Sequence, residues 1–178
     1  MGRPVGELPF MNRRHFATFA GLSGLSALAG CGFKLREAPN LAFTSLHVGV
    51  AEGSLFGNEL KRSLASLGAL QLVSDAKLKQ TAQVLLEIVQ EQREKTVVGV
   101  NAAGQVRELQ LRIRVKFKLV TPQGKELIEV TELLQQRDIS FNESAVLAKE
   151  AEEGLLYRNM QTDIIQQLLR RLAAIKQL

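Results

Sequence analysis

The chain is poor in the residues that catalytic and metal sites most often use. Its 178 residues include one cysteine, Cys31, and two histidines, His15 and His47. A single cysteine excludes an internal disulfide, and so few imidazoles leave Ser–His–Asp, Cys–His and histidine-rich metal sites without their central residue. His47, between two apolar neighbours, is expected to be a surface residue of a strand. We therefore expect no enzyme activity, no catalytic residue, no metal and no cofactor.

The sequence also lacks a hydrophobic run of about 20 residues, the length that a transmembrane helix requires. The nearest stretch, residues 16–29, is short, contains Gly, Ser and Thr, and follows two arginines. A basic start, a modest apolar run and small residues at its end are typical of a secretory signal. We expect residues 11–30 to be the signal peptide, and residues 1–10 to be an over-long start upstream of the true initiator, Met11.

The signal ends in Leu28-Ala29-Gly30-Cys31, which resembles a bacterial lipobox. Small residues before the cysteine suit cleavage between Gly30 and Cys31, and the thiol can then accept diacylglycerol. Acyl chains such as palmitate, each worth about 0.8 kcal/mol per buried CH₂, would anchor a soluble domain. The competing interpretation is a buried structural cysteine in a cytosolic domain. The arginine pair also resembles a twin-arginine signal, so the export route, twin-arginine or general, stays open.

The charge balance gives little support to a nucleic-acid partner. Three of the 23 cations and one of the 18 anions lie in residues 1–30, so the remainder carries a net charge of +3. This bias is mild compared with that of a dedicated nucleic-acid-binding protein. An exported chain would not meet cytosolic nucleic acid, and we expect no such partner.

Residues 31–42 are expected to form a lipidated tether, and residues 43–178 a single α+β domain. Hydrophobic periodicity, Ser54 as a helix cap, Gly68 as a helix stop and the Thr-Pro-Gln-Gly turn at 121–124 set the elements. The expected strands are 43–50, 82–100, 105–120 and 126–139; the expected helices are 54–67 and from 142 or 144 to the end, the second with a possible interruption at Gly154. The order β-α-β-β-β-α predicts two helices packed on one face of a four-stranded, mostly antiparallel sheet.

One expected strand carries a row of cations. Residues 109–119, LQLRIRVKFKL, alternate apolar and polar side chains, which places Arg112, Arg114, Lys116 and Lys118 on one face. Turn lengths predict the cross-strand neighbours of this row. They place Lys118 opposite Glu87, Arg114 opposite Glu91, Lys116 opposite Glu129 and Arg112 opposite Arg93; they also place Ile128, Val130 and Leu134 in the core.

Two interpretations of this row remain open. Three of its cations have a carboxylate opposite, as in a solvated face stabilised by cross-strand pairs worth roughly 0.2–1 kcal/mol each. The fourth pair, Arg93 with Arg112, is a like-charge pair with Lys95 nearby. An anionic ligand would relieve that repulsion, so the row is also a candidate anion-binding strip.

Three segments together resemble the LptE (RlpB) family of lipopolysaccharide-assembly lipoproteins. They are Cys31–Arg36 (CGFKLR), Val146–Glu150 (VLAKE) and Asp163–Leu172 (DIIQQLLRRL). The resemblance implies the same β-α-β-β-β-α order and a lipoprotein of the outer membrane that faces the periplasm. It also implies a complex with the β-barrel LptD, assistance in assembling that barrel, and delivery of lipopolysaccharide to the outer leaflet. Gly32 after the cysteine is similar to the pattern that allows release to the outer membrane.

The resemblance also suggests lipopolysaccharide-binding residues. Lys149 matches the family's lysine implicated in lipopolysaccharide contact, although a helix-surface lysine near Glu153 is an equal alternative. The family's basic hairpin tip is replaced here by Asn101-Ala102-Ala103. Arg suits lipid A phosphates through bidentate hydrogen bonds and Lys as a point charge. The candidate contacts are Lys149, Arg112, Arg93, Arg114 and Lys116.

Two other functions are weighed against this one. The chain could be a free-standing periplasmic lipoprotein that binds an anionic glycolipid or a cell-wall fragment without a barrel. A lipid-anchored hydrolase is the third possibility, and it would need carboxylates clustered in a cleft. The sequence singles out no such pair.

Overall fold

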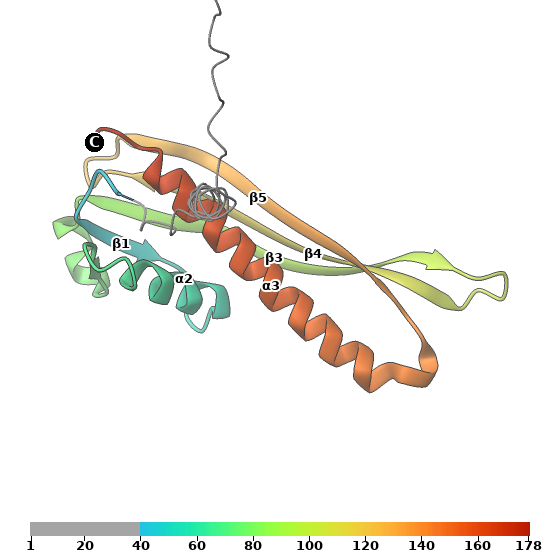
Figure 1. Ribbon diagram of the computed structural model, residues 1–178. Helices are drawn as coiled ribbons and strands as arrows, with labels where there is room; N and C mark the ends of the chain where they lie inside the picture. The colour runs from blue at the N-terminus through green and yellow to red at the C-terminus, as the bar shows by residue number, and fades with distance from the viewer. Residues whose placement is uncertain (1–39) are drawn as a thin grey trace, which may run out of the picture. The chain divides into compact units, whose positions relative to one another are not determined.

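The computed structural model describes residues 40–178. The expected signal peptide, the lipidation site at Cys31 and the tether before Asn40 lie outside the described residues. The elements are β1 (Ser45–Gly49), α2 (Leu55–Ala65), β2 (Gln71–Val73), the 3-10 helix η1 (Ala76–Thr81), β3 (Val84–Val100), β4 (Val106–Val120), β5 (Glu126–Ser140), the 3-10 helix η2 (Glu143–Ala145) and α3 (Val146–Ala173) (Figure 1).

The strands form one five-stranded mixed sheet in the order β2-β1-β3-β4-β5. β1 runs parallel to both β2 and β3, whereas β3, β4 and β5 are successively antiparallel. The prediction of a four-stranded sheet was therefore wrong, because it missed β2. That strand has three residues, too few for an alternating pattern to be visible in the sequence.

Both helices pack against one face of the sheet, as predicted. Buried residues of α2, such as Phe56 and Leu60, and of α3, such as Ile164 and Leu168, belong to the same core cluster as the inward side chains of β4. At full burial each such side chain stabilises the fold by about 1.5–3 kcal/mol. The opposite face of the sheet carries a small separate cluster of Ala82, Leu85 and Val120, with Val73 packed against it.

The start of α2 combines a cap with a close contact. Ser54 Oγ accepts a hydrogen bond from the Gly57 amide at 2.8 Å, which confirms Ser54 as the N-cap. A Cβ built at Gly57 would lie 2.7 Å from Val50 Cγ2. Gly57 is thus required for packing of α2 against the end of β1. In α3, Gly154 causes no interruption, and the helix continues to Ala173.

The strand register differs from the prediction because the β3–β4 and β4–β5 ladders contain register shifts. Shifts occur between Ile88 and Gln90 and between Phe117 and Leu119. Only the pairing of Lys118 with Glu87 is confirmed. Beyond the shifts, the opposing pairs are Arg114 with Gln92, Arg112 with Glu94, and Lys116 with Glu132.

The same shifts change which residues of β5 are buried. A one-residue slip moves every side chain of a strand to the other face. Leu133 and Ile139 occupy the core, whereas Val130 is 57% exposed and Leu134 is 42% exposed. The predicted core positions Val130 and Leu134 were wrong; Ile128 is partly buried against the core.

A chain of polar contacts joins β3, α2 and α3. Arg93 Nη2 donates to Gln161 Oε1 at 2.5 Å, and Gln161 Nε2 donates to Glu59 Oε2 at 2.5 Å. Thr162 Oγ1 donates to the other Glu59 oxygen at 2.8 Å. Gln161 is only 5% exposed, so both ends of its amide need these partners. The contacts set the position of both helices on the sheet.

Tyr157 extends this polar contact network. Its hydroxyl donates to the backbone oxygen of Glu94 at 2.7 Å, and the Arg93 guanidinium lies 5.5 Å from the ring centroid. Burial raises the pKa of Tyr157, and the nearby Glu153 charge acts in the same direction. Both effects favour the neutral phenol.

Tyr157 can be titrated directly because it is the only tyrosine and the chain has no tryptophan. In the folded protein we expect phenolate absorbance to appear at a pH above 10.0, the ordinary tyrosine pKa, and the midpoint to fall toward that value in denaturant. A pKa raised by folding gives stability that is complete below the unfolded pKa and lost as pH rises through the folded one. Equal midpoints in the two states would contradict the described burial of this ring.

Candidate functional site

The cations of β4 lie on the face of the sheet that the helices leave open. Leu111, Ile113, Val115 and Phe117 are at most 1% exposed beneath the helices. Because side chains of a strand alternate between faces, the residues between them point the other way. We call Arg112, Arg114, Lys116 and Lys118 the cationic strip.

Carboxylates from both neighbouring strands contact the cationic strip. Lys118 Nζ lies 2.9 Å from Glu87, and Arg112 Nη1 lies 3.5 Å from Glu94, both on β3. On β5, Glu132 is shared: it lies 3.9 Å from Arg114 Nε and 3.8 Å from Lys116 Nζ. The predicted repulsion between Arg93 and Arg112 was wrong, because the register places Glu94 opposite Arg112.

Three of these four ion pairs are loose. Charge-assisted hydrogen bonds are usually about 2.7–2.9 Å long, and the pairs of Arg112, Arg114 and Lys116 are longer. Within the described residues, the Nε atoms of Arg112 and Arg114 are buried and have no hydrogen-bond partner. These carboxylates therefore leave two donors of the strip unsatisfied.

Lys118 differs from the other three cations. Its hydrogen bond to Glu87, together with the charge of that carboxylate, raises the pKa of Lys118. It therefore stays protonated and well paired at neutral pH. The loosely paired part of the strip is Arg112, Arg114 and Lys116, three of the five residues predicted as lipid A contacts.

Arg93, the fourth predicted contact, does not lie with the strip. It pairs with Ile113 in the register of β3 and β4, so its side chain is on the helix side of the sheet. There it contacts Gln161 and Tyr157 of α3. The sequence signal failed here because one bulge in β3 reverses the face to which Arg93 belongs.

Lys149, the fifth predicted contact, is in the first turns of α3. Its Nζ donates to Ser140 Oγ at 3.1 Å and to Glu152 Oε2 at 2.8 Å. The expected neighbour Glu153 instead pairs with Lys95, at 2.6 Å. Lys149 and Lys95 both line a cavity of about 240 Å³, whose remaining lining includes Leu109, Ile139, Phe141 and Val146. The lining also includes Glu150 and Glu153, so this cavity brings two ammonium groups and two carboxylates together beside apolar side chains.

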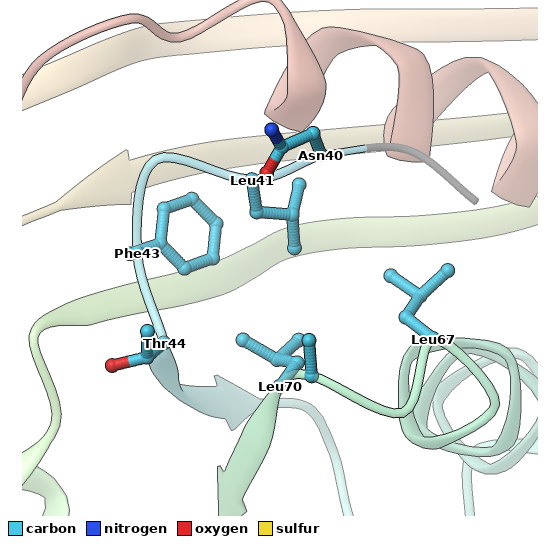
Figure 2. Close-up of a pocket in the computed structure, with 7 residues that line it drawn as sticks. Asn40, Leu41, Phe43, Thr44, Leu67 and Leu70 are labelled. Atoms are coloured by element: carbon cyan, nitrogen blue, oxygen red, sulfur yellow. The ribbon is translucent and has the colours of Figure 1, made fainter. Parts of the chain in front are cut away.

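A second hollow lies where the described chain begins. Figure 2 shows Leu41 and Phe43 on one side of it and Leu67 and Leu70 on the other. Its volume is about 310 Å³, and Asn40, Thr44 and Ala69 complete the lining. No charged side chain of residues 40–178 lines it, so this part of the chain offers an apolar group a place there and offers nothing to a phosphate.

Residues 40–178 contain no cluster of three His, Cys, Asp or Glu residues that could hold a metal ion. His47 Nδ1 lies 2.7 Å from the backbone oxygen of Val73, so the ring joins β1 to β2. Over the same residues, no helix combines the length and hydropathy that crossing a membrane would require.

The chain is similar to one described family. The LptE profile, described as Lipopolysaccharide-assembly, matches residues 43–172. The LPS-assembly lipoprotein LptE of Photorhabdus laumondii subsp. laumondii is 27% identical over 158 residues, which are 86% of this chain and 84% of that protein.

Solved structures agree with this match. Uncharacterized lipoprotein B from Nitrosomonas europaea is 33% identical, with a TM-score of 0.68 over 80% of this chain and 91% of that one. Rare lipoprotein B from Shewanella oneidensis is 20% identical, with a TM-score of 0.60 over 74% of this chain and 95% of that one. At that identity the second likeness concerns the fold alone.

The loose pairing of the cationic strip can be tested by its effect on stability. Replacing Glu132 by Gln should lower the free energy of unfolding by less than about 1 kcal/mol, since partly exposed pairs contribute little. Replacing the buried Gln161 by Ala should cost more, about 1–3 kcal/mol, because Arg93 and Glu59 lose their shared partner. Denaturant unfolding measures both. Equal losses for the two variants would show that Glu132 is firmly bound.

Proposed function

Because the chain belongs to the LptE family of lipopolysaccharide-assembly proteins, we propose that it complexes with an LptD-type β-barrel. In this role it assists assembly of the barrel and delivery of lipopolysaccharide to the outer leaflet. The observation that carries the proposal is the family match over residues 43–172, which covers nearly the whole described domain. The role consists of binding and assembly, without catalysis.

We propose further that Cys31 is lipidated after cleavage at Gly30, and that the acyl chains hold the domain at the periplasmic side of the outer membrane. The signal-like residues 11–30 and the lipobox support this placement. Two further observations agree with it: the relatives compared above are named lipoproteins, and Asn40, the first described residue, is exposed.

Lipopolysaccharide contact is assigned to the loosely paired part of the cationic strip. Arg112, Arg114 and Lys116 lie side by side on the face that α2 and α3 leave open, and the Nε atoms of the two arginines have no partner within residues 40–178. Guanidinium groups bind phosphate oxygens bidentately, and an ammonium adds a point charge. A lipid A phosphate could therefore displace Glu132 and bind the partly exposed ends of Arg114 and Lys116.

Lys149 is proposed as a separate contact, since its cavity places its ammonium group beside apolar side chains, while Lys95 in the same lining is paired with Glu153. Its present partners, Ser140 and Glu152, are exposed and can be exchanged. Arg93 is proposed as a positioning residue that holds α3 on the sheet through Gln161. It does not meet the ligand.

A free-standing lipoprotein that binds an anionic glycolipid or a cell-wall fragment is the second candidate. One observation favours it: the cationic strip is built entirely by this chain and needs no partner to complete it. The two candidates differ in whether a barrel accompanies the chain.

Extraction in a mild detergent followed by affinity purification and mass spectrometry separates them. The barrel-partner proposal predicts recovery of the chain together with a much larger β-barrel protein, and an acylated N-terminus at Cys31. Recovery of the acylated chain alone, at every detergent concentration, would favour the second candidate.

Lipopolysaccharide binding should depend on the strip and not on charge in general. Replacing Arg112, Arg114 and Lys116 together by Gln should weaken binding at least about tenfold, equivalent to about 1.4 kcal/mol. The matched control replaces three exposed cations, Arg170 and Arg171 at the end of α3 and Lys176 after it, and should leave affinity nearly unchanged. Titration with labelled lipopolysaccharide measures both. Equal losses of affinity for the two variants would show that binding depends on net charge alone.

A further inference from the structure

The cavity beside Lys149 lies where β5 leads through η2 into the start of α3 (Figure 1). Its volume is about 240 Å³, and Leu109, Ile139, Phe141 and Val146 supply its apolar lining. Pockets for drug-sized molecules usually measure about 300–1,000 Å³. This cavity therefore suits a single polar headgroup, with the first carbons attached to it, better than a whole lipid.

The part of α3 that borders the cavity is not packed into the core. The helix begins at Val146, but its buried residues lie between Met160 and Leu172. In its first turns, Leu147 is 82% exposed and Leu155 is 53% exposed. A small ligand can therefore reach the cavity without unpacking a buried side chain of α3.

Four charged side chains line the cavity, and their charges cancel. Lys95 and Lys149 contribute two ammonium groups, and Glu150 and Glu153 contribute two carboxylates. Lys95 Nζ lies 2.6 Å from Glu153 Oε2, and these side chains are 45% and 21% exposed. Lys149 Nζ instead lies 2.8 Å from Glu152 Oε2, and Glu150 forms no ion pair within residues 40–178.

This balance of charge decides which class of ligand fits the cavity. A plain anion that bound Lys95 would separate it from Glu153 and leave that carboxylate without its partner, which costs free energy. A ligand with both a phosphate and an ammonium group would replace one ion pair by two. A primary ammonium also brings three N–H donors to the carboxylate oxygens, and a quaternary ammonium has none.

We propose that this cavity binds a phosphoethanolamine group. The two lysines hold the phosphate, Glu150 and Glu153 hold the ammonium, and the apolar lining receives the neighbouring carbons. The inference rests on the proposed ligand contact at Lys149 and deepens it, because it assigns the acidic half of the cavity to a second charge of the ligand. The cationic strip plays no part in it.

Three short-chain phospholipids test the choice of headgroup. The full chain, purified in a mild detergent, is titrated with dihexanoyl phosphatidylethanolamine, phosphatidylglycerol or phosphatidylcholine, which differ in their headgroups alone. Chemical shifts of the backbone amides of Val146 and Glu150 report on the cavity. We expect phosphatidylethanolamine to bind about fivefold more tightly than the other two, the factor that one partly exposed ion pair supplies.

Replacing Glu150 and Glu153 together by Gln should abolish this preference while phosphatidylglycerol still binds, since the lysines remain. The matched control replaces Glu52 and Glu129 by Gln; both are exposed, neither lines the cavity, and the preference should persist. Lys149→Gln should weaken binding of all three lipids alike, which tests the proposed contact separately from the headgroup preference. Circular dichroism shows whether each variant is folded.

Two kinds of lipid can supply the group, phosphatidylethanolamine and a lipid A whose phosphate carries ethanolamine. Lipopolysaccharide preparations with and without that substituent distinguish them. Equal affinity for the two preparations would assign the cavity to the phospholipid. Tighter binding of the substituted preparation, lost when Glu150 and Glu153 are replaced, would assign it to lipid A.

Three results would overturn the proposal. In the first, phosphatidylglycerol or phosphatidylcholine binds as tightly as phosphatidylethanolamine, which would show that the carboxylates recognise no primary ammonium. In the second, the control variant loses the preference as fully as the variant of Glu150 and Glu153. In the third, none of the three lipids shifts the amides beside the cavity. Each result would leave the barrel complex and lipopolysaccharide binding by the cationic strip untouched, because those have their own tests.

Discussion

The structure depends on the burial of one side of β4. Leu111, Ile113, Val115 and Phe117 are almost fully buried beneath the helices. At about 1.5–3 kcal/mol for each side chain, this burial exceeds the roughly 0–1 kcal/mol expected of a partly exposed ion pair. The core therefore decides the register, and the cations between these residues go to the open face whether or not carboxylates fit them. The cationic strip is loosely paired because burial of the core side chains contributes more free energy than its ion pairs do.

The regular elements could be predicted from the sequence because their patterns are long. The alternating residues 109–119 lie in β4, and the helical spacing that begins at residue 157 lies in α3, which ends at Ala173. β2 could not be predicted, since three residues show no periodicity and the strand exists through its pairing with β1. The bulges were also invisible, because they arise where the twist of long strands is accommodated, and no Gly or Pro marks the shift between Ile88 and Gln90.

The candidate site was predictable to the same extent. The row of cations follows directly from alternation, but its partners depend on register. One bulge in β3 moves Arg93 to the helix side of the sheet. Arg112 then faces Glu94 in place of Arg93, so the predicted like-charge pair does not form. The argument for a ligand from repulsion therefore fails. What supports the proposed anion site is different: long ion-pair distances, and Nε atoms of Arg112 and Arg114 without partners in the described part of the chain.

Lysine footprinting tests most directly whether the open face of the sheet binds lipopolysaccharide. An amine-reactive acylating reagent, read out by mass spectrometry, would compare the chain with and without bound lipopolysaccharide. The account predicts that Lys116, which is partly exposed, becomes protected, while Lys61 on α2 and Lys176 after α3 label at unchanged rates. Protection of Lys61 and Lys176 with unchanged labelling of Lys116 would contradict it, because the ligand would then bind away from the cationic strip.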